Sequence, residues 1–363
     1  MTLRKVTRTA PSYKSVEKTV AAQIGRTRAH AHTMRRVMQT RETRMAHAGW
    51  TQNLIQAGRL QGGERVLVVV DEPLAAEGAE LLAAVQDAGG HGRLELWTGE
   101  RPLDKAPQPI LDAAEVADLS LFLAEKPLPE EGGARFSLLQ TVAGHGGRQI
   151  FLGFVDGELL RGELSQPATD LERPARDLLA QLEGSETVHI WGRAGTDLTL
   201  GVVGRPWMSD ALPLENGQMA NYPGGEVFVA PHKDGADGVL VVDLTVPYTV
   251  EGLVDEPVRL RFDNGRVTSI EGGRAAEMLR TIVDDAGEGA DVVAELGIGF
   301  NPTVRPRGHV MLDEKAARTA HVAIGRNTGP YGGDNEATIH VDCVFSEPEI
   351  EADGKPVDLP RLP

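Results

Sequence analysis

The sequence has a single cysteine, Cys343, among its 363 residues. One cysteine cannot form an intrachain disulfide, so we exclude a disulfide-stabilised extracellular scaffold and predict a reducing, cytoplasmic location. Long apolar runs are also missing, and none approaches the roughly 18 residues that a membrane-spanning helix needs. Residues 1–40 are basic but contain no apolar core segment, so they lack the pattern of a secretory signal.

Positive charge is scarce. The chain has 37 lysines and arginines against 53 acidic residues, a net charge of -16, which argues against nucleic acid or an anionic membrane as partner. Residues 1–50 differ, with eleven basic residues against Glu17 and Glu42. We predict a basic helical extension over residues 1–60. A solvated helix is the favoured interpretation; docking onto the acidic body or onto a partner subunit is the alternative, and a homodimer is expected.

Residues 61–184 have no nucleotide-binding fingerprint. No G-x-G-x-x-G motif follows Val70, and no G-x-x-x-x-G-K-[ST] motif occurs anywhere in the chain. Apolar strand patterns nevertheless alternate with helical patterns and short glycine-rich joints. Residues 65–70 form a continuous apolar run of the kind buried on both faces of a parallel sheet. We therefore predict a doubly wound α/β domain that does not bind nucleotides.

Residues 185–363 have a different pattern, with short strands and few helices. The Asp-Asn-Gly-Arg sequence at 263–266 is a hairpin signal between two of these strands. The main helix is expected over residues 275–286. We predict an α+β, mostly antiparallel domain, with its boundary near residue 184.

Residues 294–345 contain most of the chemically interesting side chains. Glu295 follows an apolar run and precedes a glycine-rich turn, and a helical pattern over residues 313–321 ends at His321. Further on, His340 and Asp342 lie two positions apart in a strand pattern, so they point to the same face. Imidazole and carboxylate groups gathered in this way form a possible ligand set for a metal ion.

Glu226 has the same character as Glu295, because it enters an apolar strand directly after a Pro-Gly-Gly turn. An ionised carboxylate among apolar neighbours is unfavourable unless a cation or hydrogen bonds compensate it. Its simpler interpretation is an ion pair with an arginine. Glu314 and Lys315 begin the expected helix and are predicted to be mainly solvated, with reach into the site as the alternative for either. Glu314 is kept as a candidate general base.

Five blocks of the sequence resemble the thermophilic-type metallo-aminopeptidases, the aminopeptidase T family, in order and approximate spacing. The blocks are residues 195–198, 223–231, 295–302, 313–325 and 340–342. The resemblance covers roughly residues 185–345. It implies a two-metal site in which Zn, Co or Mn activates water against the amide bond of a small peptide.

Residue by residue, the resemblance implies that the metal ligands are Glu226, Glu295, His321, His340 and Asp342. It implies a catalytic role for Glu226 as well, beside the candidate base Glu314. Better-known members carry a tyrosine shortly after the histidine that matches His321, and whether Tyr331 fills that place stays open.

A related branch gives the alternative function. The 2,5-dihydroxypyridine dioxygenases are similar in the glycine-rich loop before His340 and bind one Fe(II) through two histidines and a carboxylate. Their first histidine falls where this chain has Glu295, and they do not keep the equivalents of Glu226 and His321. A triad of His321, His340 and Asp342 would therefore differ from theirs. A non-enzymatic binding module is the third and least favoured possibility.

Overall fold

A computed structural model of the chain describes residues 49–166, 170–211 and 214–360. Most of the predicted basic extension lies outside these residues, and only its last helix, α2 (Gly49–Ala57), is described. Trp50 and Leu54 of α2 are fully buried. This last part of the predicted extension is therefore part of the core and not a solvated arm.

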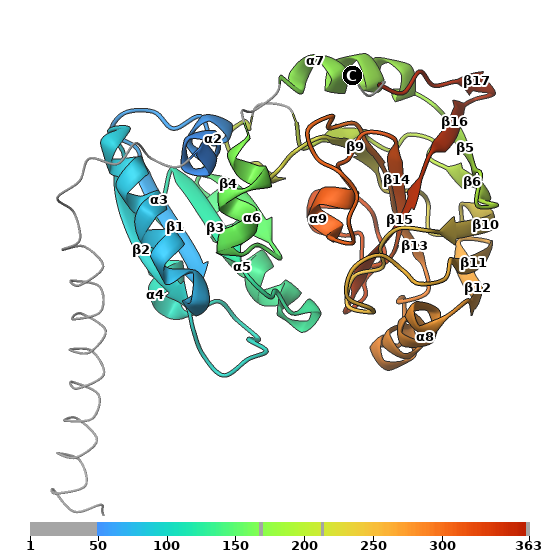
Figure 1. The fold of residues 1–363 in the computed structure, drawn as a ribbon, viewed down its shortest axis with the longest axis horizontal. Coiled ribbons are helices and arrows are strands. Elements are labelled where there is room, and N and C mark those ends of the chain that lie inside the picture. Colours follow the sequence, from blue (N-terminus) through green and yellow to red (C-terminus); the bar gives the residue numbers. More distant parts are fainter. Residues whose placement is uncertain (1–48, 167–169, 212–213, 361–363) are drawn as a thin grey trace, which may run out of the picture. The chain divides into compact units, whose positions relative to one another are not determined.

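Five parallel strands form the first sheet, in the order β2-β1-β3-β4-β8. The first four of them are labelled in Figure 1. Their bounds are β1 (Arg65–Asp71), β2 (His91–Trp97), β3 (Leu119–Ala124), β4 (Arg148–Gly153) and β8 (Met219–Asn221). The first four come from the predicted α/β region. The short edge strand β8 comes from beyond residue 184, so the chain returns to this sheet after leaving it.

Helices cover both faces of the parallel sheet. Val66, Val68 and Val70 of β1 face a core that includes residues of α2, α3 and α6, whereas Leu67 and Val69 face a core shared with α4 and α5. This arrangement confirms the predicted parallel α/β class. The helices are α3 (Ala75–Asp87), α4 (Gln108–Ala114), α5 (Gly132–Ala143) and α6 (Gly157–Arg161), with short 3-10 turns η1 (Glu72–Leu74), η2 (Pro129–Glu131) and η3 (Glu163–Ser165). Within the described ranges, no helix has the length and apolar character needed to cross a membrane.

Two antiparallel sheets make up most of the remaining chain. The larger has the order β12-β11-β10-β6-β5-β16-β17 and the smaller β15-β14-β13-β9-β7. The strands of the larger are β5 (Thr187–Gly192), β6 (Asp197–Gly201), β10 (Ala236–Val242), β11 (Val258–Asp263), β12 (Arg266–Glu271), β16 (Pro348–Ala352) and β17 (Lys355–Pro356). Those of the smaller are β7 (Met208–Ser209), β9 (Glu226–Val229), β13 (Val293–Gly299), β14 (Thr319–Gly325) and β15 (His340–Ser346).

Both antiparallel sheets contribute to one apolar core, which includes Leu240 of β10 and Leu296 of β13. The β11–β12 hairpin turns at Asn264 and Gly265, whose φ angles of 47° and 77° are those of a tight hairpin turn. The hairpin prediction is therefore confirmed. The remaining helices are α7 (Glu172–Leu182), α8 (Arg274–Ala286), α9 (Val310–Asp313) and the 3-10 turn η4 (Gly329–Tyr331).

The predicted helix over residues 313–321 is wrong. The helix α9 ends at Asp313, Arg318 adopts a left-handed φ of 67°, and His321 lies within strand β14. All seven residues of β14 are buried, because this strand lies between β13 and β15. Pairing on both sides outweighs the helix-favouring composition of this short segment.

Candidate metal centre

Four neighbouring strands carry the five predicted metal ligands. Glu226 lies on β9, Glu295 on β13, His321 on β14, and both His340 and Asp342 on β15. Directly paired residues of antiparallel strands share a face, and so do residues two positions apart. The register pairs Gly299 with Glu226, Gly297 with His321, Glu295 with Ala323, and Ala323 with Asp342. The sheet therefore places all five side chains on one face.

Small residues on the same face make room for these side chains. Gly297 lies directly opposite His321, and a Cβ atom added to it would lie 2.0 Å from Cε1 of the imidazole. Real Cβ atoms do not approach other heavy atoms this closely, so the ring of His321 occupies the space above Gly297. Glycine at this position is a geometric requirement of the centre.

Three of the ligands form an outer group, consisting of Glu295, His340 and Asp342. Nε2 of His340 lies 3.3 Å from Oε2 of Glu295 and 3.2 Å from Oδ1 of Asp342. Nδ1 of His340 donates a 2.6 Å hydrogen bond to the carbonyl oxygen of Arg326. A backbone acceptor at Nδ1 fixes the ring and leaves Nε2 as the ligand atom, as is usual for metal-binding histidines.

A second, inner group consists of Glu226, Glu295 and His321, all of them buried. Nε2 of His321 lies 3.5 Å from Oε1 of Glu295, and Nδ1 lies 3.9 Å from Oε2 of Glu226. Neither Nδ1 of His321 nor Oε2 of Glu226 has a hydrogen-bond partner among the described residues. Buried polar atoms normally have partners, so the unpartnered Oε2 of Glu226 fits a ligand of a cation. Glu295 belongs to both groups.

The predictions for Glu314 and Lys315 are wrong, because both side chains are buried and not solvated. Nζ of Lys315 lies 3.0 Å from Oε1 of Glu314 and 3.1 Å from Oδ2 of Asp210, and it is in direct contact with Oε1 of Glu226. Glu226 is thus paired with a lysine and not with an arginine. Glu314 and Lys315 do both reach the site, which was the alternative to solvation. The sequence analysis missed Asp210, which no pattern in the sequence singles out.

Asp210 also fixes the backbone that leads into Glu226. Its Oδ1 accepts hydrogen bonds from the amides of Gly225 and Glu226, at 2.8 and 3.0 Å. One carboxylate thus holds both the main chain of Glu226 and the ammonium that contacts its side chain. These contacts hold the main chain and Oε1 of Glu226.

The charges of the candidate centre shift the pKa values of its histidine and carboxylate side chains. Burial alone would lower the pKa of His321, but the contact with Glu295 and the charges of Glu226 and Asp342 raise it to about 9. Burial raises the pKa of Glu226 well above its usual value and also raises that of Glu314, in both cases against the charge of Lys315. Contact between oppositely charged groups favours their ionised forms, whereas burial alone favours the neutral forms.

In the outer group, the pKa values of the carboxylates are lowered and not raised. Burial would raise the pKa values of Glu295 and Asp342, but contacts with histidine hold both below their ordinary values. Burial alone would lower the pKa of His340, but the contacts of its ring with the carboxylates of Asp342 and Glu295 raise it. A carboxylate kept in its anionic form is the form that binds a cation.

Tyr331 closes one side of the outer group. Its ring is stacked on that of His340, with 4.6 Å between centroids and 18° between planes. Phe228 approaches the edge of the same ring at 6.3 Å. Burial raises the pKa of the Tyr331 phenol, so its hydroxyl stays protonated at neutral pH. The structure therefore brings Tyr331 to the centre.

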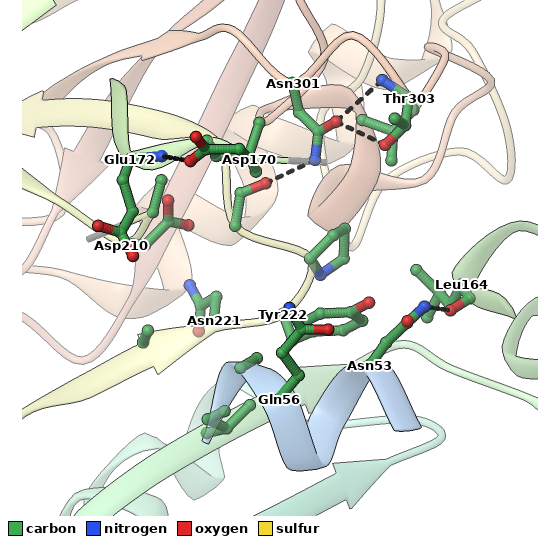
Figure 2. Close-up of a pocket in the computed structure, with 18 of the residues that line it drawn as sticks. Asn53, Gln56, Leu164, Asp170, Glu172, Asp210, Asn221, Tyr222, Asn301 and Thr303 are labelled. Carbon is green, nitrogen blue, oxygen red and sulfur yellow. Dashed lines mark hydrogen bonds between the residues drawn. The ribbon is translucent and has the colours of Figure 1, made fainter. Parts of the chain in front are cut away.

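A cavity of about 600 Å³ lies beyond Asp210 (Figure 2). Asn53 of α2, Tyr222 and Asn301 are among the residues that line it. The Asn301 amide donates to the carbonyl oxygen of Gly224, and its own oxygen accepts from Thr303. Asp210 lines this cavity and also forms an ion pair with Lys315, so this residue lies between the cavity and the buried ammonium.

Comparison with known proteins gives two kinds of relative. A family model described as NicX: 2,5-dihydroxypyridine 5,6-dioxygenase matches residues 101–358. The 2,5-dihydroxypyridine 5,6-dioxygenase of Pseudomonas putida is 25% identical over 267 residues, which are 70% of this chain and 72% of that protein. The solved structure of a 2,5-dihydroxypyridine dioxygenase from Pseudomonas putida has a TM-score of 0.68 and 21% identity, and covers 87% of this chain and 97% of that one. At this identity the structural likeness shows a shared fold.

Aminopeptidase T of Thermus aquaticus is more similar over a shorter stretch. It is 32% identical over 190 residues, which are 47% of this chain and 45% of that protein. The chain therefore spans about half the length of the aminopeptidase that it matches. The relatives on both sides are enzymes, and they support the resemblance drawn from the sequence blocks.

Proposed function

The chain belongs to the NicX family, whose model is described as 2,5-dihydroxypyridine 5,6-dioxygenase. From its candidate ligand set and its similarity to aminopeptidase T, we propose that it is a two-metal hydrolase of the aminopeptidase T type. The substrate would be the N-terminal amide bond of a small peptide. The proposed ligands are the five residues of the inner and outer groups.

The observation that carries this proposal is the position of Glu295 between the two groups. One of its oxygens faces His321 and the other faces His340, as expected for a carboxylate shared by two ions. The charge of the buried carboxylates also supports two ions. Asp210, Glu226, Glu295, Glu314 and Asp342 are five carboxylates, and Lys315 offsets one of them. Two divalent ions would balance the remaining four charges once both histidines have lost their protons on metal binding.

Mixed imidazole and carboxylate ligands favour Zn, Co, Mn or Fe over Ca or Mg. When bound, a pair of such ions polarises an amide carbonyl and lowers the pKa of a water molecule. Residues of the chain orient the ligands of these ions. His340 is held by the Arg326 carbonyl and by the stacked ring of Tyr331, so its Nε2 has a fixed direction.

Glu314 is the proposed general base. Its Oε1 lies 3.0 Å from Nζ of Lys315, which also contacts Glu226 of the inner group. Burial raises its pKa toward the range in which a carboxylate both accepts a proton from water and returns it to a leaving amine. Lys315, at 3.0 Å, orients this carboxylate through one of its oxygens.

The second candidate is a mononuclear Fe(II) dioxygenase that opens a hydroxylated N-heteroaromatic ring. The family match and the 70% coverage of this chain by the Pseudomonas putida enzyme favour it. A triad is also available, because Oδ1 of Asp342 lies 3.2 Å from Nε2 of His340 and 3.8 Å from Nε2 of His321. This candidate leaves the buried pair Glu226 and Glu295 without a second cation.

Metal analysis combined with two activity assays separates the candidates. The hydrolase proposal expects two ions per chain and release of amino acids from short peptides with a free N-terminus. His340→Ala should lose at least one ion and the activity. One iron per chain with oxygen uptake on dihydroxypyridine substrates would establish the second candidate instead. Two ions without peptide turnover would leave the metal centre in place and remove the peptidase activity.

A further inference from the structure

Lys315 is a buried ammonium surrounded by three carboxylates. Its side chain is 1% exposed, and the side chains of Asp210, Glu226 and Glu314 are 5–6% exposed. All three carboxylates lie within ion-pairing distance of Nζ. Burying an ammonium is unfavourable unless several acceptors compensate it, and here three acceptors converge on one point.

Oxygen-only groups of this kind are what hard divalent cations bind in proteins. Lys315 therefore occupies the position that a cation would take if the lysine were absent. This position is separate from both ligand groups, because it uses Oε1 of Glu226 whereas Oε2 faces His321. Glu226 thus lies between a fixed cation of the protein and the proposed inner ion.

We propose that Lys315 serves as a built-in third cation, which keeps the oxygen-only position closed to metal and leaves a single oxygen of Glu226 for the inner ion. The inference rests on the proposed two-ion centre. Lys315 is in this view a positioning residue, because it acts on the ions through Glu226 and Glu314. Asp210 completes the arrangement by holding both the ammonium and the amides of Gly225 and Glu226.

The proposal predicts a new metal site when the ammonium is removed. In Lys315→Ala, three buried carboxylates would surround the position of the former ammonium without a counterion. Since this site contains no histidine, it should prefer Mn²⁺ or Mg²⁺, whereas the two histidine-containing groups retain Zn²⁺. The protein would be loaded with Zn²⁺, freed of excess metal, and titrated with Mn²⁺ while the free-ion Mn²⁺ signal is followed by electron paramagnetic resonance.

We expect Lys315→Ala to bind one Mn²⁺ per chain, at least about ten times more tightly than the wild type, because the three carboxylates form a dedicated oxygen site. Lys315→Arg retains a cation and should bind none. Adding Glu314→Gln to the alanine variant removes one of the three carboxylates and should abolish the gain. If the alanine variant does not fold, Lys315→Ser leaves similar room with a hydroxyl group and is titrated in the same way.

Unchanged Mn²⁺ binding in a folded Lys315→Ala or Lys315→Ser variant would overturn the proposal. Equal Mn²⁺ binding by the arginine variant would also overturn it, because that result would not depend on the loss of a cation. The Zn²⁺ content of the wild type is a separate readout. One Zn²⁺ instead of two would remove the two-ion centre, yet the gain of a Mn²⁺ ion on loss of Lys315 would still be measurable.

Discussion

Oε2 of Glu226 and Nδ1 of His321 face each other across 3.9 Å, too far apart for a hydrogen bond, and neither has another partner among the described residues. We expect the inner ion to bind Oε2 of Glu226. Glu226→Gln should reduce the metal content from two ions to one per chain, measured by elemental analysis after treatment with a chelator and reloading. Asp342→Asn should affect the outer ion instead. Two ions retained in Glu226→Gln would contradict the assignment.

Metal removal should also lower stability, because ions that bind only the folded chain shift the unfolding equilibrium. At a free metal concentration 100 times Kd, each site adds about 2.7 kcal/mol to the free energy of unfolding. Thermal unfolding of the chelator-treated and reloaded protein measures this difference. Glu226→Gln should show about half of the wild-type gain.

Gly297→Ala should displace the ring of His321 and remove the inner ion. The added Cβ would lie 2.0 Å from Cε1 and 2.4 Å from Nε2 of His321, and overpacking of this kind typically destabilises by about 1–3 kcal/mol. Elemental analysis and urea unfolding measure the two effects. A matched control is Gly92→Ala, where the clash at 2.4 Å is with Cδ1 of Leu82, the end of a flexible side chain remote from the five ligands. The control should keep both ions.

Much of the fold could be predicted because local patterns determine it. The apolar run at 65–70 indicated a strand buried on both faces, and the Asn264-Gly265 pair indicated a hairpin. Alternation along β15 also placed His340 and Asp342 together, and the structure leaves these two partly exposed while Val341 and Cys343 are buried. In each case, the deciding interactions lie within a few residues of one another.

The parts that could not be predicted depend on strand register and on partners distant in the chain. Lys315 is separated by 89 residues from Glu226, so its burial depends on an ion pair that no local pattern indicates. Pairing between β9, β13 and β14 brings Glu226 beside Glu295 and His321. The helix prediction at 313–321 failed for a related reason, since pairing of β14 on both sides overrode local preference.

Arg101→Met tests a buried ion pair outside the metal centre. Arg101 donates a 2.8 Å hydrogen bond to Glu131 and lies 3.4 Å from Asp71, and both carboxylates are buried. Because the Arg101 side chain is partly exposed, we expect a loss of about 2–3 kcal/mol at pH 7, below the roughly 3–5 kcal/mol of a fully buried pair. Arg93→Met, which breaks a surface pair with Glu95, should lose about 1 kcal/mol or less.

The effect of Arg101→Met should depend on pH. Burial favours the neutral form of Glu131, but Arg101 and the amide of Leu103 bring its pKa below the ordinary value of 4.5. A lowered folded-state pKa stabilises the protein above pH 4.5, and this stabilisation is lost as the pH falls through the lower value. The difference between wild type and variant should therefore be largest at pH 7 and shrink below pH 4.5. Urea unfolding at pH 7, 5.5 and 4 measures it, and a constant difference would contradict this explanation.

Tyr331 allows its ring and its hydroxyl group to be tested separately. Tyr331→Ala removes the stack on His340, and since such contacts contribute about 0.5–1.5 kcal/mol, the outer ion should bind roughly 2–10 times more weakly. Tyr331→Phe keeps the stack and should leave the affinity for both ions unchanged. If the phenol acts on the substrate, the phenylalanine variant should lower kcat for peptide hydrolysis at unaltered metal content. Competitive metal titration and steady-state kinetics on the same preparations distinguish these roles. Equal kcat in wild type and Tyr331→Phe would show that Tyr331 contributes only through its ring.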